Sequence, residues 1–477
     1  MSTVTPATSC CFLDIVTFPM RAPINALLWL AERVRQLYVR CLGFFVKIGT
    51  FMFGTYHKGF WQREIIEMFK SSPCDTNERT RFDPSRLTDS ETILKNLGGF
   101  ISHVWPKDGG AKIEYYHVSH KDVKAKIEEK GGQWIEVAVR ETDKGYVYDR
   151  ESPLTIEIIF AREHSSQWQE HYDNTLKCIG WEEVKLEYDG QAHQVLMTTK
   201  WRGKERIDPE ALFLYSHSPT SSWAMDRGYI ARHIGLHASV CMYDYRGTWN
   251  STGDPSEGGY YNDARAVYDQ MMRFGYKAKK TVVAGFCLGG AVAADLKRTH
   301  PDTIFVPINT FDSFKRIMGN QVFPFGFLGN TALEVIKDES LDVAQDLFDT
   351  ADKLSKMRKD VTRGATLQIA TTTDTTLPSG AIDNVHAAAE RAGRVYQLLF
   401  TPDKPGNGHS CDPLRDPSFV ERYVEVLTKL IPERAPQPRP PSPPPQIPVA
   451  PLTSCGLQAQ EGGFPFSRHS DQPILVE

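Results

Sequence analysis

One cysteine in this sequence lies in a setting that favours nucleophilic chemistry. Residues 285–290 read Gly-Phe-Cys-Leu-Gly-Gly, so that Cys287 follows an apolar run and precedes a helix-forming stretch. The glycines permit a tight strand-to-helix turn, which exposes the central side chain at a helix N-terminus. There the helix dipole favours a thiolate over a thiol. The alternative is a buried structural cysteine, which is common for this residue type, but the flanking strand and helix patterns favour a nucleophile.

A cysteine nucleophile needs a base, and the base needs an acid that orients it. In this kind of turn the chain order is nucleophile, acid, base. The run 365–374 ends in Asp374, and His409 lies in the loop that follows the run 395–401. Both residues therefore fall at carboxyl ends of predicted strands, and we predict a triad of Cys287, Asp374 and His409. Other acids compete for the middle role, namely Asp312, Asp383 and Asp403.

An acyl-transfer site also needs hydrogen-bond donors aimed at the developing oxyanion. One predicted donor is the backbone N–H of Leu288, the residue after the nucleophile. The second is expected from the loop that follows the run 211–217. Since proline has no N–H, Ser218 or Thr220 must donate around Pro219, and both alternatives remain open. His233, His237 and Cys411 are expected to have no chemical role.

The elements that position these residues form a regular alternation. Helix-like segments at 222–235, 258–275, 288–299 and 381–393 lie between apolar strand-like runs at 211–217, 238–245, 280–286, 304–311, 365–374 and 395–401. Continuous apolar strands that alternate with helices predict an α/β fold, with a mostly parallel sheet covered by helices on both faces. Residues 312–364 exceed a simple crossover and are expected to hold a helical lid near the carboxyl ends of the strands, where ligands bind.

Residues 184–431 together resemble the α/β-hydrolase superfamily, and the pattern is most similar to the membrane-tethered α/β-hydrolase-domain esterases and lipases. The long stretch 243–271, which includes Asp244, Arg246 and Asp263, resembles that family along its length. Three positions differ from the family pattern. Cysteine replaces the usual serine, as in the dienelactone hydrolases, and Trp249 and Ser218 stand where small residues are usual.

The remaining chain is expected to divide into three parts. Residues 1–56 form an apolar arm, and residues 57–183 form a mixed α+β region with strand-like runs after residue 111. The runs 184–188 and 194–200, separated by Asp-Gly, predict an antiparallel hairpin that opens the hydrolase domain. Residues 432–477 form a proline-rich tail, expected to be disordered or in polyproline II conformation.

The apolar arm raises the question of membrane contact. Residues 37–56 are long enough to span a bilayer, but they contain Arg40 and Lys47, and a central basic residue costs about 2.5–3.5 kcal/mol on insertion scales. A membrane-surface helix within 10–56 is therefore at least as plausible as a span. A helical arm that packs its apolar face against the rest of the protein is the third alternative. No secretory signal peptide is recognised. The expected location is cytoplasmic or membrane-associated.

Composition excludes several classes of protein. The net charge of −4 shows no basic footprint, so no nucleic-acid partner is expected. The nine cysteines are scattered and form no CxxC pair, which favours free thiols and gives no metal or cofactor site. The PxxP spacing in the tail could bind a partner with a PxxP-recognising groove.

Two functions follow from this reading. The first is a cysteine-nucleophile hydrolase or acyltransferase that acts on an ester or thioester, with a small-molecule or lipid acyl substrate. The second is a catalytically silent hydrolase fold that acts as a membrane-associated interaction protein. The intact-looking positions of Asp374 and His409 favour the first.

Overall fold

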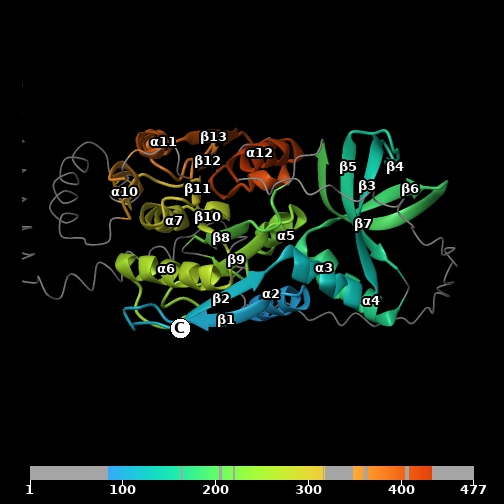
Figure 1. The fold of residues 1–477 in the computed structure, drawn as a ribbon, viewed down its shortest axis with the longest axis horizontal. Coiled ribbons are helices and arrows are strands. Elements are labelled where there is room, and N and C mark those ends of the chain that lie inside the picture. The colour runs from blue at the N-terminus through green and yellow to red at the C-terminus, as the bar shows by residue number, and fades with distance from the viewer. Residues whose placement is uncertain are drawn as a thin grey trace, which may run out of the picture. The chain divides into compact units, whose positions relative to one another are not determined.

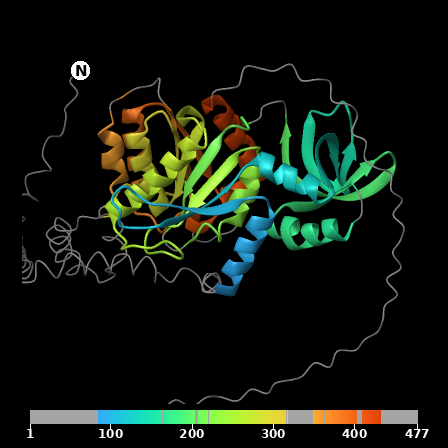
Figure 2. The same ribbon diagram turned by 60° about the horizontal axis from the view of Figure 1, so that its bottom comes forward.

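The computed structural model (Figures 1 and 2) describes most of the chain between residues 84 and 431. The described residues are 84–162, 165–202, 207–218, 221–314, 316, 348–357, 359, 364–402 and 408–431. The predicted apolar arm 1–56, the proline-rich tail 432–477 and most of the predicted lid 312–364 lie outside them. Among the helices of the described part, none is both long and apolar enough to cross a membrane.

An eight-stranded sheet forms the centre of the fold, in the order β1-β2-β9-β8-β10-β11-β12-β13. The strands from β9 to β13 pair in parallel, and β2 is antiparallel to its neighbours β1 and β9. The bounds are β1 (Phe100–Val104), β2 (Ile113–Val118), β8 (Leu212–Ser216), β9 (Ser239–Tyr243), β10 (Thr281–Phe286), β11 (Ile304–Ile308), β12 (Thr366–Thr371) and β13 (Val395–Phe400). The predicted mostly parallel α/β sheet is confirmed.

Helices cover both faces of this sheet, which explains why its strands are continuously apolar. In β8, Phe213 and Tyr215 belong to one buried core, whereas Leu212 and Leu214 belong to the other. The first core is closed by α2 (Pro84–Asn96), α5 (Arg227–Gly235) and α12 (Pro417–Leu430). The second is closed by α6 (Glu257–Arg273), α7 (Leu288–Thr299), α10 (Thr350–Ser355) and α11 (Ala381–Ala392). Figure 2 shows the red helix α12 and the yellow-green helices α6 and α7 on opposite sides of the strands.

Local sequence sets where these helices begin. The Ser256 side chain accepts the N–H of Gly259 at 3.1 Å and so caps α6, which satisfies a donor that the first turn cannot pair internally. Asp416 caps α12 in the same way, and Pro417 occupies the first helical position, where its missing N–H costs nothing. The helix α5 begins at Arg227, five residues after the predicted start at 222.

The sheet begins earlier in the chain than residue 184, where the hydrolase domain was expected to start. Its first two strands, β1 and β2, come from the region 57–183. Local patterns identify β2 as a strand but carry no information on its partner, which is β9 more than a hundred residues later. The physical reason for the difference is that strand pairing is set by hydrogen bonds across the fold rather than along the chain.

A closed barrel of five strands is inserted between β2 and β8, in the order β3-β4-β6-β7-β5. The strands are β3 (Gly132–Thr142), β4 (Gly145–Tyr148), β5 (Leu154–Ala161), β6 (Glu182–Tyr188) and β7 (Gln191–Arg202), with α3 (His120–Glu129) and α4 (Ser166–His171) beside them in sequence. The predicted hairpin is β6–β7, paired antiparallel around Asp189 and Gly190. It closes the barrel instead of opening the sheet.

Candidate active site

Cys287 occupies the turn between β10 and α7, as the sequence predicts. Its backbone angles are φ 55° and ψ −116°, a conformation that a residue with a side chain adopts only when its surroundings impose it. Its N–H donates to the carbonyl of Ile308 at 3.0 Å, and the residue is 8% exposed. Because α7 starts at the next residue, Cys287 lies at the N-terminal end of that helix, where the helix dipole favours negative charge.

Glycines make this turn possible because two backbones approach closely. A Cβ on Gly285 would lie 2.1 Å from the carbonyl oxygen of Gly289. A Cβ on Gly289 would lie 1.9 Å from the carbonyl oxygen of Ser216 at the end of β8. Both distances are far inside van der Waals contact, so any larger residue would force the turn away from the sheet. The spacing of glycines around Cys287 is therefore a requirement of the packing.

The predicted acid and base meet at the same edge of the sheet. His409 lies in the short helical turn η5 (Gly408–Ser410), and its Nδ1–H donates to Oδ2 of Asp374 at 2.7 Å. The other oxygen of Asp374, Oδ1, accepts the N–H groups of Thr376 at 2.9 Å and Leu377 at 3.1 Å. The side chains of Asp374 and His409 are 1% and 8% exposed. The carboxylate is thus held by three donors and orients the imidazole.

His409 also contacts the nucleophile. Burial alone would lower the pKa of this histidine. The charges of Cys287 and Asp374 and the hydrogen bonds to both side chains outweigh burial, and they raise the pKa to about 10. Because Nδ1 is engaged by Asp374, Nε2 is the nitrogen left for Cys287. A histidine that contacts a cysteine through one ring nitrogen, and is bound by a carboxylate through the other, is the arrangement that nucleophilic catalysis by cysteine requires. The ring of Phe286 packs on that of His409, with centroids 5.1 Å apart.

The two competing acids that the structure describes have other partners or lie on the surface. Asp312 pairs with Arg316 and accepts the amide of Asn384 at 2.6 Å, Asp383 is exposed on α11, and Asp403 lies outside the described residues. Among the described histidines, His233 contacts the Tyr229 carbonyl and the Tyr423 hydroxyl, so it is part of the core. The catalytic roles of Cys287, Asp374 and His409 remain predictions, but these three side chains are the ones that the fold brings together.

The predicted oxyanion donors lie on two elements. Leu288 is the first residue of α7, where a helical N–H has no partner within the helix. The carbonyl of Ser218, which follows β8, accepts the N–H of Ser221 at 3.1 Å, which folds this loop back on itself. Thr220 lies outside the described residues. The choice between Ser218 and Thr220 as the second donor stays a prediction.

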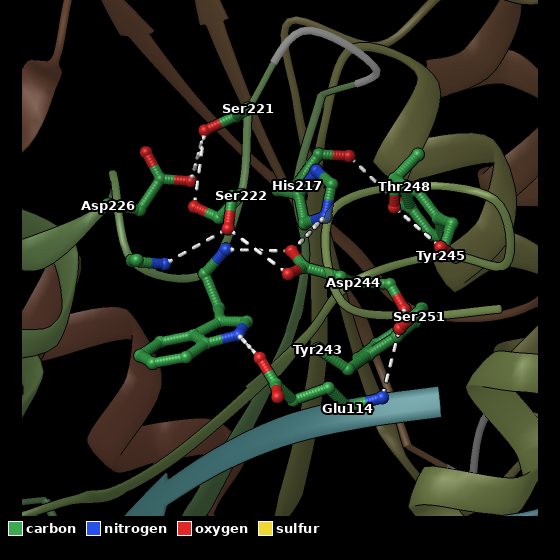
Figure 3. A network of polar contacts seen from close by, with 12 residues as sticks. Glu114, His217, Ser221, Ser222, Asp226, Tyr243, Asp244, Tyr245, Thr248 and Ser251 are labelled. Carbon is green, nitrogen blue, oxygen red and sulfur yellow. Dashed lines mark hydrogen bonds and ion pairs between the residues drawn. The ribbon is translucent and has the colours of Figure 1, made fainter. Parts of the chain in front are cut away.

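The loop after β8 is held by a buried polar network that sequence reasoning did not identify (Figure 3). His217, with no exposed surface, has Nδ1 2.5 Å from the Ser218 carbonyl and Nε2 3.3 Å from Oδ1 of Asp244. Asp244 also accepts the Ser222 hydroxyl at 3.2 Å and the Trp223 N–H at 3.1 Å. Both ring nitrogens of His217 therefore lie near oxygen atoms, of the Ser218 carbonyl on one side and of the Asp244 carboxyl group on the other.

The electrostatics of this pair agree with its geometry. Burial would lower the pKa of His217, but the hydrogen bond and charge of Asp244 outweigh it and raise the pKa. Burial also raises the pKa of Asp244, so desolvation opposes the charge on both partners, and a buried pair of this kind is weak evidence for stability. The signal in the sequence is a histidine and an aspartate that each directly follow a continuously apolar strand, where a charge needs a partner.

The stretch that carries the family resemblance is also tied together by ion pairs. Nε and Nη2 of Arg246 donate to Oδ1 of Asp263 at 2.9 and 2.7 Å, and the backbone N–H of Arg246 donates to Oδ2 at 2.8 Å. The guanidinium also reaches Asp108 at 2.9 Å. Burial raises the pKa of Asp263 to about 6 despite these contacts. Among the described residues, no group of three or more His, Cys, Asp or Glu side chains is arranged to hold a metal ion.

The chain is similar to several curated proteins. It is 37% identical to the protein bem46 of Schizosaccharomyces pombe over 127 residues, which is 26% of this chain and 42% of that protein. It is 33% identical to the alpha/beta hydrolase domain-containing protein WAV2 of Arabidopsis thaliana over 131 residues, again 26% and 42%. It is 25% identical to the alpha/beta hydrolase domain-containing protein 17B of Xenopus tropicalis over 285 residues, 57% of this chain and 85% of that one. The chain thus spans less than half the length of the first two relatives, and no protein-family model matches it.

Proposed function

We propose that this chain, which belongs to the α/β-hydrolase superfamily, is a hydrolase or acyltransferase that uses Cys287 as its nucleophile on ester or thioester substrates. The observation that carries the proposal is the contact of Cys287 with His409, whose Nδ1–H is bound by the buried carboxylate of Asp374 at 2.7 Å. Nucleophile, base and orienting acid in this relation are the requirements for acyl transfer.

In the first half of the reaction, the sulfur of Cys287 attacks the carbonyl carbon of the substrate. The carbonyl electrons move to the oxygen, which the N–H of Leu288 and one donor of the loop after β8 stabilise. The imidazolium of His409 then gives its Nε2 proton to the departing alkoxide or thiolate as the carbon–heteroatom bond breaks. The acyl group is now a thioester on Cys287, and His409 is neutral.

In the second half, neutral His409 takes a proton from water or from an acceptor hydroxyl or thiol. The resulting nucleophile attacks the acyl-enzyme carbonyl, the carbon–sulfur bond breaks, and the thiolate–imidazolium pair is restored. Throughout, Asp374 keeps the Nδ1 proton in place, so that Nε2 is always the nitrogen that exchanges protons. Hydrolysis and transfer differ only in which acceptor reaches the thioester.

A lipid acyl group is one of the substrate classes that the sequence allows, beside other small-molecule esters and thioesters. A membrane-surface helix within residues 10–56, one of the alternatives for the apolar arm, would bring the site close to such a substrate. Covalent labelling tests the proposal: iodoacetamide, which alkylates thiolates at carbon, is expected to modify Cys287 as read by mass spectrometry of the tryptic peptide. Release from p-nitrophenyl esters and acyl-thioesters is expected to fall on the order of 10³-fold or more in Cys287→Ala.

Two control variants separate the nucleophile from other thiols. Cys178→Ala removes an exposed thiol, and Cys411→Ala removes the half-buried thiol two residues after His409. Both variants are expected to keep wild-type turnover and labelling of Cys287. Equal turnover in wild type and Cys287→Ala, or labelling confined to other cysteines, would contradict the proposal and leave the catalytically silent interaction protein as the better reading.

A further inference from the structure

The end of β11 contacts the chain segments of all three predicted catalytic residues. Ile308, its last residue, accepts the N–H of Cys287 at 3.0 Å. Asn309 follows directly, is fully buried, and has φ 43°, a left-handed conformation that asparagine tolerates better than most residues. This conformation places its side chain among the segments that lead to Asp374 and to His409.

Both polar atoms of the Asn309 side-chain amide form hydrogen bonds. Oδ1 accepts the backbone N–H of Thr371 at 2.8 Å, while Nδ2 donates to the Thr371 hydroxyl at 3.0 Å and to the carbonyl oxygen of His409 at 2.8 Å. The backbone N–H of Asn309 donates to Ile369 at 3.0 Å. No other functional group of this size supplies one acceptor and two donors in a single plane.

These bonds fix the two loops that carry the acid and the base. Thr371 ends β12, and its carbonyl accepts the N–H of Asp374 at 3.2 Å. On the other side, the N–H of Gly408 donates to the carbonyl of Thr373 at 3.0 Å. The amide of Asn309 therefore ties the start of the acid loop to the backbone of His409 itself.

We infer that Asn309 is a positioning residue for the proposed acyl-transfer reaction, which holds His409 and Asp374 in register with the nucleophile turn. The inference rests on the function proposed above. The side-chain hydrogen bonds of Asn309 go to Thr371 and to the carbonyl of His409, so its effect passes through the backbone of His409 and the end of β12. Since reacting groups must be placed to within about 1 Å, loosening this point is expected to slow the chemistry without weakening substrate binding.

The test compares Asn309→Ala with Gln368→Ala. Gln368 is a buried amide on β12, and its side chain contacts the Ile382 carbonyl, His386 and Gln397. Gln368→Ala is therefore a matched control. It also removes a buried, hydrogen-bonded amide from β12, the strand that leads to Asp374, but at a position away from the carboxyl end of that strand. Both variants are first checked for folding by circular dichroism and thermal unfolding.

The readouts are the rate of Cys287 alkylation by iodoacetamide between pH 5 and 10 and the separate values of kcat and KM on a p-nitrophenyl ester. In Asn309→Ala, alkylation at neutral pH and kcat are expected to fall on the order of 10- to 100-fold with KM unchanged, whereas Gln368→Ala is expected to keep wild-type values. If Asn309→Ala does not fold, Thr371→Val removes only the hydroxyl that accepts from Nδ2 and is expected to give a smaller decrease of the same kind.

Wild-type alkylation and kcat in a folded Asn309→Ala or Thr371→Val protein would overturn the inference. Equal decreases in Asn309→Ala and Gln368→Ala would overturn it too, because they would show general loosening of the core. Wild-type protein whose Cys287 is not alkylated, or Cys287→Ala with full turnover, would instead contradict the proposed function itself.

Discussion

The bond between Asp374 and His409 allows a worked prediction for the substitution Asp374→Asn. In the native site Oδ1 accepts the N–H groups of Thr376 and Leu377, while Oδ2 accepts Nδ1–H of His409. The asparagine oxygen is expected to keep the two backbone donors, so its NH₂ group takes the place of Oδ2. A donor then faces a donor, and only the bond to His409 is lost.

The expected loss follows from that single bond. A hydrogen bond to a charged group contributes about 1.5–3 kcal/mol, and every 1.4 kcal/mol corresponds to about tenfold in rate or equilibrium. The population of the reactive thiolate–imidazolium pair, and with it kcat/KM, is therefore expected to fall about 10- to 150-fold. The neutral ring is also driven to the tautomer with its proton on Nε2, which cannot act as the base, so the larger figure is favoured.

The assay is the pH dependence of iodoacetamide alkylation at Cys287, together with p-nitrophenyl ester turnover. Asp374→Asn is expected to lower the pKa of His409, because the carboxylate is one of the groups that raise it. Asp295→Asn is the control. Asp295 is buried and pairs with Arg265 on α6 and Arg298 on α7, so this variant also loses a buried carboxylate, but outside the candidate active site. Wild-type alkylation in Asp374→Asn, or an equal decrease in both variants, would refute this reasoning.

Three further predictions concern the turn, the buried pair and the alkaline pH limit. Gly289→Ala puts a Cβ against a backbone carbonyl, and we expect it to lower the free energy of unfolding in urea by about 1–3 kcal/mol or more. The control is Gly258→Ala in α6, whose Cβ meets open space, so this variant is expected to be neutral or to stabilise by up to about 1 kcal/mol. Equal destabilisation by both variants would contradict the packing argument. Asp244→Asn is expected to cost about 3–5 kcal/mol, because it removes one partner of a buried, hydrogen-bonded pair. A loss below about 1 kcal/mol in the same assay would show that the pair adds little to stability. The pKa of His409 is raised to about 10, so the ring keeps the proton for the leaving group at neutral pH and loses it as the pH rises through about 10. Turnover of an alkyl ester is therefore expected to decline near that pH. A decline near the ordinary histidine pKa of about 6.5 would contradict the assigned pairing of His409.

The elements that carry the candidate site were predictable because their signals are local. Continuous apolar runs identified β8 through β13, and the residues after these strands identified Cys287, Asp374 and His409 as candidates. The glycines at 285 and 289 mark a turn that larger side chains would prevent. Each of these inferences depends on a few consecutive residues, which set backbone conformation directly.

The barrel and the first strands of the sheet were not predictable in the same way. The runs that became β2 through β7 were recognised as strands, but β2 entered the sheet and the hairpin β6–β7 closed the barrel. An alternating strand can pair with strands of the sheet or of the barrel, because its pattern indicates which face is buried but does not indicate which strand supplies the hydrogen bonds. The partners are set by contacts between segments far apart in the chain.

Sequence alone determined the order of strands and helices along the second half of the chain, the nucleophile turn and the residue types of the predicted triad. Only the tertiary structure decided that Asp374, rather than Asp312 or Asp383, meets His409, and that Asn309 and His217 hold the loops around them. The reason is physical: residue type and local pattern set a group's chemistry and backbone, but the distance between two side chains depends on how the strands that carry them are paired. The parallel pairing of β10, β11 and β12 brings the ends of these three strands to one edge of the sheet.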